Sequence, residues 1–109
     1  MARTGPVPTL VCYHPKKGKE AELQALVEKH WAVLATTGLV TRDPARLWKA
    51  TDKRSGATYF VEMFEWKDAE APGIAHQTPA VMAIWEPLGP LLEEMKLASL
   101  EPLLQARGK

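Results

Sequence analysis

The sequence has only one cysteine, Cys12, among its 109 residues. One cysteine excludes an intrachain disulfide framework and favours a reduced compartment, so we expect a cytoplasmic protein. The sequence also has no large excess of positive or negative charge, because it contains 14 Lys and Arg and 13 Asp and Glu. A balanced chain lacks the basic surface that binds nucleic acid. No run approaches the roughly 20 apolar residues that span a bilayer, so we expect neither a nucleic-acid nor a membrane partner.

Several motifs of catalytic and cofactor sites are absent as well. The three histidines and one cysteine lack metal-ligand spacing, so the sequence predicts no metal site. The seven glycines are scattered and form no phosphate-binding fingerprint, and no Gly-x-Ser-x-Gly element indicates a serine nucleophile. Residues 1–9 contain two prolines and no apolar core, which is not typical of a secretory signal. We expect a protein without a resident cofactor.

The residues that are present predict a single globular domain, with 46% hydrophobic side chains over residues 1–109 and a core at about 9–101. Apolar residues recur at intervals of two in the expected strands and of three or four in the expected helices. Pro72-Gly73 and Pro79 should interrupt the second helical region, and Pro87 and Pro90 should kink or shorten it. The expected elements are strand 9–14, helix 19–36, strands 46–51 and 58–66, a helical region from 67 that restarts at Thr78-Pro79, and strand 96–101, followed by a tail from 103.

This order, strand-helix-strand-strand-helix-strand, predicts an α+β, ferredoxin-like fold with helices on one face of an antiparallel sheet. The strand at 58–66 is apolar on both faces: Tyr59, Val61 and Met63 share one parity, and Phe60 and Phe64 share the other. A strand of this kind needs cover on both faces. We therefore expect a homodimer that pairs sheet against sheet.

Three segments resemble the antibiotic biosynthesis monooxygenase (ABM) family of dimeric α+β barrels. They are FVEMFEWKDAEA at 60–71, AHQTP at 75–79 and the helix start KxGKxxxL at 16–23, and the resemblance extends over about residues 9–101. The family includes cofactor-free oxygenases, haem-degrading enzymes and small-molecule-binding proteins. The resemblance therefore implies the fold more firmly than any one activity.

The family's functional residues match this chain only in part. Trp66 is similar to a tryptophan at the end of the third strand that the haem-degrading branch uses. In the cofactor-free, quinone-forming branch an asparagine, a tryptophan and an arginine contact the substrate, and only the tryptophan has a counterpart in this chain. The haem branch also uses a strand-one asparagine, and this sequence has no asparagine. The histidine that ligates haem in that branch lies further along the second helix than His76, where this chain has Ala80, Val81 and Met82. The resemblance therefore disfavours haem degradation.

His76 and Glu62 are the candidate catalytic residues. His76 lies between two helical segments, where it could act as an acid or a base, or could instead cap the break in the helix. Glu62 shares its strand face with aromatic residues, and loss of solvent there would favour the neutral carboxyl and suit it to act as a base. The alternatives for Glu62 are an ion pair, for example with Lys49, and a solvated edge position.

The candidate ligand-binding residues are aromatic or lie at strand ends. Trp66, Phe64 and Trp85 could form the walls of a pocket for a flat conjugated molecule, or could be ordinary core residues. His14 could reach the cleft from the end of the first strand, or could be a solvated strand end. His30 lies on the apolar stripe of the first helix, which indicates a core or cleft-lining position.

Three functions remain open at this point. The first is an ABM-like protein that binds a small apolar or aromatic molecule and acts as a cofactor-independent monooxygenase on a phenolic or enolic substrate. In that hypothesis Glu62 or His76 removes a proton, and the resulting anion reacts with dioxygen. The second is a non-catalytic homodimer that binds a ligand or another protein. The third, which the missing asparagine disfavours, is a haem-handling protein.

Overall fold

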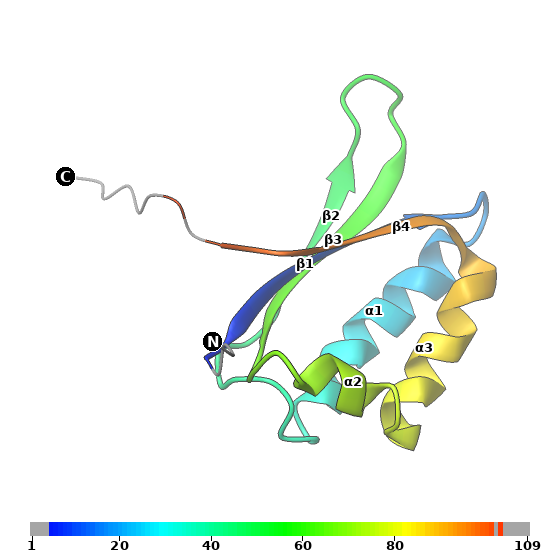
Figure 1. Cartoon of the computed structure of the whole chain (residues 1–109). Helices are drawn as coiled ribbons and strands as arrows, with labels where there is room; N and C mark the ends of the chain where they lie inside the picture. The colour runs from blue at the N-terminus through cyan, green and yellow to red at the C-terminus, as the bar shows by residue number, and fades with distance from the viewer. Residues whose placement is uncertain (1–4, 102, 104–109) are drawn as a thin grey trace.

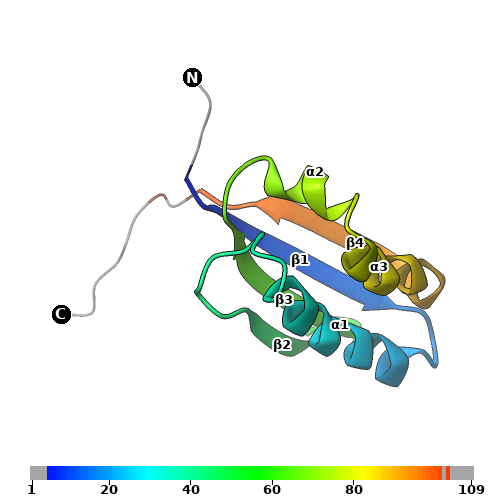
Figure 2. The ribbon, with the colours of Figure 1, turned by 90° about the horizontal axis from the view of Figure 1, so that it is seen from below.

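The structure of this protein is a computed structural model that describes residues 5–101 and 103. In these residues the segments with alternating apolar side chains form four strands, and the segments with helical periodicity form three helices. Residues 104–109 of the expected tail lie outside the described residues. The sheet has the order β2-β3-β1-β4 with every pair antiparallel, and the helices cover one of its faces (Figures 1 and 2). The predicted α+β, ferredoxin-like fold is confirmed. The elements are β1 (Val7–Pro15), α1 (Glu20–Leu34), β2 (Arg46–Thr51), β3 (Thr58–Trp66), α2 (Ala71–Ala75), α3 (Pro79–Leu91) and β4 (Leu92–Ser99).

Two boundaries differ from the sequence-based expectation. Pro72 and Gly73 lie within the short helix α2 rather than ending a helix, because proline fits the first helical turn, where its missing N–H is not needed. Helix α3 continues through Pro87 and Pro90 to Leu91, so the prolines do not shorten it. Its buried face, which includes Val81 and Leu88, packs against the core, and this packing outweighs the lost backbone hydrogen bonds.

The last strand begins four residues earlier than predicted. Leu92 directly follows the last residue of α3 and already has an extended backbone, with φ −100° and ψ 131°. Strand β4 therefore follows the helix without a loop and pairs with β1 from Leu92 to Ser99. The pairing ends close to the predicted boundary, since the Leu100 N–H still donates to the Pro8 carbonyl at 2.8 Å.

Strand register decides which side chains face the helices. Opposite residues of neighbouring strands share a face, and the row Leu47, Glu62, Val11 and Leu97 faces α1 and α3. The adjacent row, Trp48, Val61, Cys12 and Lys96, faces the opposite way. We call these two surfaces the inner face and the outer face of the sheet.

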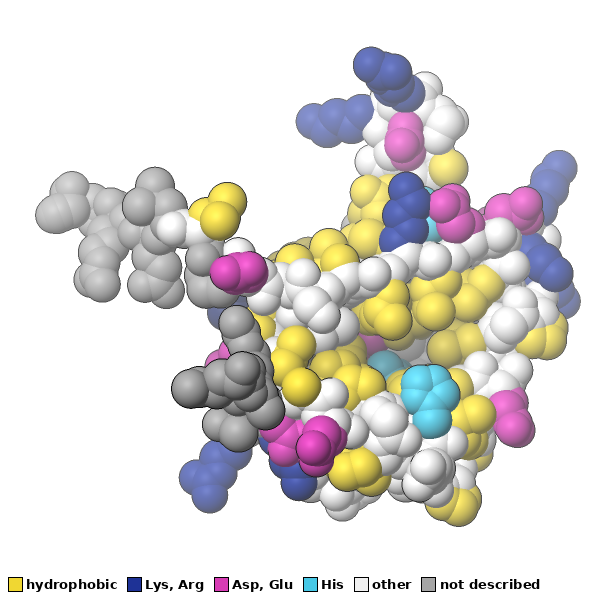
Figure 3. Space-filling view, in the orientation of Figure 1, with side chains coloured by type: hydrophobic (Ala, Val, Ile, Leu, Met, Phe, Trp, Pro, Cys, Tyr) yellow, Lys and Arg dark blue, Asp and Glu magenta, His cyan; other side chains and the backbone are white. Residues whose placement is uncertain are grey.

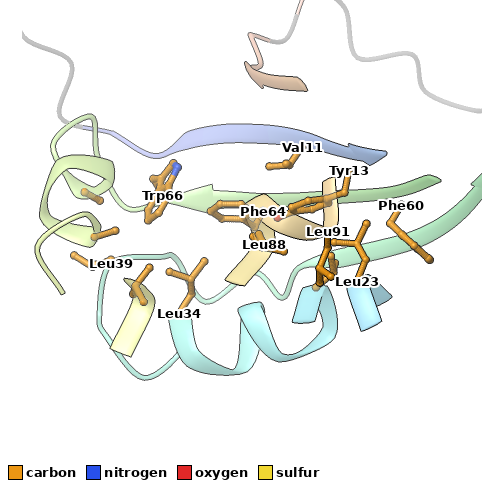
Figure 4. Packing of buried hydrophobic residues seen from close by; sticks show 14 residues of the cluster. Val11, Tyr13, Leu23, Leu34, Leu39, Phe60, Phe64, Trp66, Leu88 and Leu91 are labelled. Carbon is orange, nitrogen blue, oxygen red and sulfur yellow. The ribbon is translucent and has the colours of Figure 1, made fainter. Parts of the chain in front are cut away.

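The hydrophobic core lies between the inner face and the helices (Figure 4). The predicted apolar stripe of the first helix is confirmed: its buried residues include Leu23, Val27 and Leu34. From β3, Phe60, Phe64 and Trp66 enter the same core. The outer face carries Tyr59, Val61 and Met63 only half-buried, and Trp48 is 48% exposed.

The β2–β3 hairpin turns through residues 52–57, which begin with the polar residues Asp52, Lys53, Arg54 and Ser55. The Asp52 carboxylate accepts hydrogen bonds from the backbone N–H groups of Ser55 and Arg54, at 2.9 and 2.8 Å. These bonds lower the pKa of Asp52 below its ordinary value. Gly56 closes the turn with φ +77°, a conformation that side chains with a Cβ rarely adopt.

Candidate functional site

A cavity of about 580 Å³ lies between the inner face of the sheet and helices α2 and α3. Figure 3 shows a hollow with hydrophobic walls on this side of the molecule, with histidine side chains in and beside it. Within the described part of the chain, no Lys, Arg, Asp or Glu lines the cavity. The lining residues with polar atoms in their side chains are Thr9, Tyr13, His30, His76 and Ser99, together with Trp66 and Trp85.

The structure brings most of the predicted site residues to this cavity. Phe64, Trp66, His76 and Trp85 all line it. The two aromatic rings of β3 meet edge to face, with 5.0 Å between the ring centroids of Phe64 and Trp66. These residues come from β3, α3 and the segment after α2, so the predicted cleft between sheet and helices is present.

Glu62 lies behind the cavity wall, and its side chain has no exposed surface. The Tyr13 hydroxyl donates to Glu62 Oε1 at 2.6 Å. His30 Nδ1 lies 3.0 Å from Glu62 Oε1 and 2.9 Å from Oε2. The alternative ion pair with Lys49 is not formed, because Lys49 is exposed and pairs in register with Phe60.

His30 links this carboxylate to the cavity. The indole N–H of Trp85 donates to His30 Nε2 at 2.8 Å. An indole nitrogen can only donate, so Nε2 must be the unprotonated nitrogen of the ring. The ring is therefore neutral, and its Nδ1–H donates to Glu62. We call Tyr13, Glu62, His30 and Trp85 the Glu62 network.

The hydrogen bonds also define the charge of this network. Glu62 accepts from the Tyr13 hydroxyl and from His30 Nδ1–H, which makes it an ionised carboxylate. Burial, and then the negative charge of Glu62, raise the pKa of Tyr13 above its ordinary value of 10.0. Tyr13 therefore keeps its proton, and the network carries one negative charge beneath an apolar cavity.

His76 lies at the C-terminal end of α2, on the cavity lining. Its Nδ1 lies 2.9 Å from the Pro72 carbonyl oxygen, which can only accept, so Nδ1 carries the proton. Its backbone N–H also donates to Pro72 O at 3.2 Å, so the expected capping contact is present. The capping bonds use only Nδ1 and the backbone N–H, so they leave Nε2 free. The ring meets Trp85 edge to face at 4.8 Å.

His14 is not brought to the cavity. It stacks on Tyr59, with 4.7 Å between ring centroids and 14° between ring planes. In β1 the buried residues are Thr9, Val11 and Tyr13, so alternation turns His14 to the outer face. The prediction that His14 lines the cleft is therefore corrected: the strand reaches the cleft through its neighbour Tyr13.

Two site residues carried little signal in the sequence. Tyr13 could have been found from the alternation of β1, if the buried parity of that strand had been known. His30 was expected in the core or the cleft, and it lies at both, with 3% of its surface exposed. Its pairing with Glu62 crosses from α1 to β3 and leaves no local pattern.

Two classes of site are not found in the described residues. Over residues 5–101 and 103, no group of three or more His, Cys, Asp or Glu is placed to hold a metal ion. None of the helices described in this range is long and apolar enough to cross a membrane.

The fold is shared with several solved structures. Rv0793 from Mycobacterium tuberculosis superposes with a TM-score of 0.71 at 18% identity, over 94% of this chain and 100% of that chain. SnoaB, a cofactor-independent oxygenase from Streptomyces nogalater, gives a TM-score of 0.66 at 18% identity, over 94% and 99%. A structure described as an antibiotic biosynthesis monooxygenase gives 0.67 at 12% identity, over 90% and 99%.

These likenesses confirm the ABM-like fold that the sequence motifs indicated. Neither a protein-family model nor a curated protein sequence matches the chain. At identities of 18% and below, the structures establish the architecture, and the function has to be argued from the cavity and its residues.

Proposed function

We propose that this protein binds a flat, uncharged aromatic molecule in the 580 Å³ cavity and acts on it as a cofactor-independent monooxygenase. The observation that carries the proposal is the position of His76, whose Nε2 lone pair is free of the capping bonds at the lining of an aromatic-walled cavity. A neutral imidazole is the side chain best suited to take a proton near neutral pH.

The cavity supports this class of ligand in size and in chemistry. Its volume lies within the roughly 300–1,000 Å³ typical of small-molecule sites. The rings of Phe64, Trp66 and Trp85 offer faces and edges on which a conjugated ring system can stack. A carboxylate or phosphate ligand would meet no basic partner among the described lining residues, and it would lie close to the charge on Glu62. A phenol or an enol enters the cavity without a charge and meets neither obstacle on binding, and the anion that it later forms is balanced by the proton that His76 takes up.

The proposed reaction needs only the substrate, dioxygen and a base. His76 Nε2 takes the proton of a phenolic hydroxyl or of the acidic C–H that it activates. The electron-rich anion then reduces dioxygen at a ring C–H carbon ortho or para to the hydroxyl: one oxygen atom becomes the second carbonyl of a quinone, and the other leaves as water with the hydroxyl hydrogen and the hydrogen of that ring carbon. The protein contributes orientation, proton transfer and exclusion of water.

Of the two predicted bases, we assign proton removal to His76 rather than to Glu62. Glu62 is completely buried and its oxygens already accept from Tyr13 and His30. A carboxylate in that position cannot contact a ligand without loss of the network. Glu62 is therefore a positioning residue in this proposal.

We further propose that the protein is a homodimer that pairs through the outer face of the sheet. The half-buried side chains of Tyr59, Val61 and Met63 lie there beside the exposed Trp48. An apolar face on an otherwise charged surface is typical of a protein interface, and dimerisation through the sheet is what the ABM-like fold implies.

Oxygen uptake with a panel of naphthols and quinols tests the catalytic proposal. The wild-type protein should consume oxygen with at least one of these substrates. His76→Gln should lower kcat about 100-fold or more, the effect typical of losing a general base, with little change in KM. Gln77→Ala, at the exposed neighbouring position, is the matched control and should keep full activity.

Two other results would contradict the catalytic proposal. Uptake that is equal in wild type and His76→Gln would show that His76 is not the base. Binding of the aromatic panel with no oxygen uptake would favour a non-catalytic ligand-binding protein, because the apolar cavity alone is enough to bind. In that case His76→Gln would only remove a capping bond and destabilise the fold by about 1 kcal/mol.

A further inference from the structure

His30 has the orientation of a second ligand-contacting group. Its ring lies between a buried carboxylate and the cavity, and each nitrogen has one partner: Nδ1–H donates to Glu62, and Nε2 accepts from Trp85. A carboxylate that fixes one imidazole nitrogen leaves the other oriented as an acceptor, which is the arrangement that hydrolytic triads use. Here the acceptor is bonded to Trp85, and His30 and Trp85 both line the cavity.

The two ends of this arrangement differ in how firmly they are held. At the carboxylate end, Tyr13 and Glu62 are buried, with 2% and 0% of their surfaces exposed, and they belong to adjacent paired strands. At the other end, Trp85 is only partly buried and forms part of the cavity wall. A ligand in the cavity can therefore displace the indole N–H, whereas it cannot reach the carboxylate.

We propose that His30 Nε2 accepts a hydrogen bond from a hydroxyl group of the ligand, and that the Trp85 indole N–H takes this place in the empty cavity. Glu62 orients His30, and Tyr13 orients Glu62, so both are positioning residues. The proposal rests on the proposed function only in that it places an aromatic ligand in this cavity. It does not depend on oxygenase activity.

The arrangement determines which ligands the site prefers. An aromatic hydroxyl can replace the indole donor and keep His30 Nε2 paired. An ether or an unsubstituted ring has no donor to offer, so it leaves the indole N–H on His30 Nε2 and gains no hydrogen bond there. The site should therefore prefer donor-bearing rings only weakly while Trp85 competes for His30, and more strongly once that donor is removed. His76, whose ring contacts Trp85 edge to face, then addresses a second position on the ligand.

Binding of 2-naphthol and 2-methoxynaphthalene tests this selection, because the two probes share a ring system and differ in the donor. In the wild type, the naphthol must compete with the indole N–H for His30 Nε2. Trp85→Phe keeps an aromatic ring but removes that competitor. We expect the preference for 2-naphthol over 2-methoxynaphthalene, measured as a ratio of Kd values, to rise about five- to tenfold in Trp85→Phe.

Trp66→Phe is the matched control. It removes an indole from the same cavity without changing the partners of His30. It should weaken both probes to a similar degree and leave their ratio unchanged. A ratio in Trp85→Phe equal to that of the wild type, or an equal rise in Trp66→Phe, would overturn the proposal.

Nitrogen NMR of the unmodified protein gives a result that does not depend on how well a variant folds. In the ligand-free protein, His30 Nε2 should be the unprotonated nitrogen. Saturating 2-naphthol should shift both this resonance and the Trp85 indole N–H resonance. If 2-naphthol binds in the cavity and neither resonance shifts, the role of His30 fails while the proposed binding function stands. If neither probe binds, both proposals fail.

Discussion

Replacing Tyr13 by phenylalanine removes one hydroxyl from the Glu62 network and keeps the ring that packs in the core. The lost bond, 2.6 Å from Tyr13 Oη to Glu62 Oε1, is a hydrogen bond to an ionised acceptor. Such bonds contribute about 1.5–3 kcal/mol to the free energy of unfolding. In the variant, His30 would be the remaining hydrogen-bond donor to the buried carboxylate. We expect Tyr13→Phe to lower the free energy of unfolding by about 2–3 kcal/mol at pH 7.

The loss should also depend on pH, because the fold raises the pKa of Tyr13. Above the ordinary tyrosine value of 10.0, the unfolded chain releases this proton while the folded chain keeps it. Stability that comes from holding the proton is therefore complete below pH 10 and is lost as pH rises, by about 1.4 kcal/mol per pH unit. Tyr13→Phe lacks this proton, so the gap between wild type and variant should narrow above pH 10.

Urea unfolding from pH 7 to pH 11, followed by far-UV circular dichroism at one fixed protein concentration, measures both effects. A fixed concentration is needed because a dimer gains apparent stability with concentration. Tyr59→Phe is the control, because the Tyr59 ring stacks on His14 on the outer face, away from Glu62. Removing the Tyr59 hydroxyl should lower the free energy of unfolding by less than about 0.5 kcal/mol. A loss at Tyr13 no greater than at Tyr59, or a gap that stays constant to pH 11, would refute the reasoning.

Three further outcomes test other parts of the structure. Gly56→Ala places a Cβ at φ +77° and should lower the free energy of unfolding in urea by about 1 kcal/mol. Gly73→Ala, in α2 with open space around it, should leave this free energy unchanged or raise it. Equal losses of stability in the two variants would contradict the turn geometry. Val61→Glu, on the outer face, should convert the dimer to a monomer in light scattering, and Lys29→Glu, on the exposed surface of α1, should not; a wild-type monomer would refute the dimer. Native mass spectrometry of the purified protein should give twice 12.1 kDa, and a haem or flavin adduct would contradict the expectation of no resident cofactor.

Much of the fold could be predicted because periodicity reports burial directly. Residues 58–66 alternate between the two faces of β3, and the structure buries Phe60, Phe64 and Trp66 as that alternation requires. The stripe of the first helix was equally readable. The end of α3 could not be predicted, because two prolines indicated a break that tertiary packing overrides. In addition, α3 ends at Leu91 and β4 begins at Leu92, so no turn residue marks the boundary in the sequence.

On the strands, the site was predictable only where the buried face of the strand was already known. Phe64 and Trp66 follow from the parity of β3. Strand β1 has apolar or aromatic residues at both parities, so nothing in residues 9–14 said whether Tyr13 or His14 faced the helices. The bond between His30 and Glu62 joins residues 32 positions apart, and no periodicity encodes a contact of that kind.

The Glu62 network makes the fold less stable than an apolar cluster at the same place would. Glu62 is an ionised group with no exposed surface, and His30, its partner on α1, is neutral because Trp85 occupies its second nitrogen. A buried charge without a counter-charge costs stability, and an apolar side chain would pack at this place between Phe60 and Phe64 at lower cost. Departures from local consistency of this kind are typical of functional sites. The carboxylate keeps Nδ1 of His30 protonated and leaves Nε2 as an acceptor beside Trp85 on the cavity lining. The proposed contact of Nε2 with a ligand would account for a charge that the fold itself does not need.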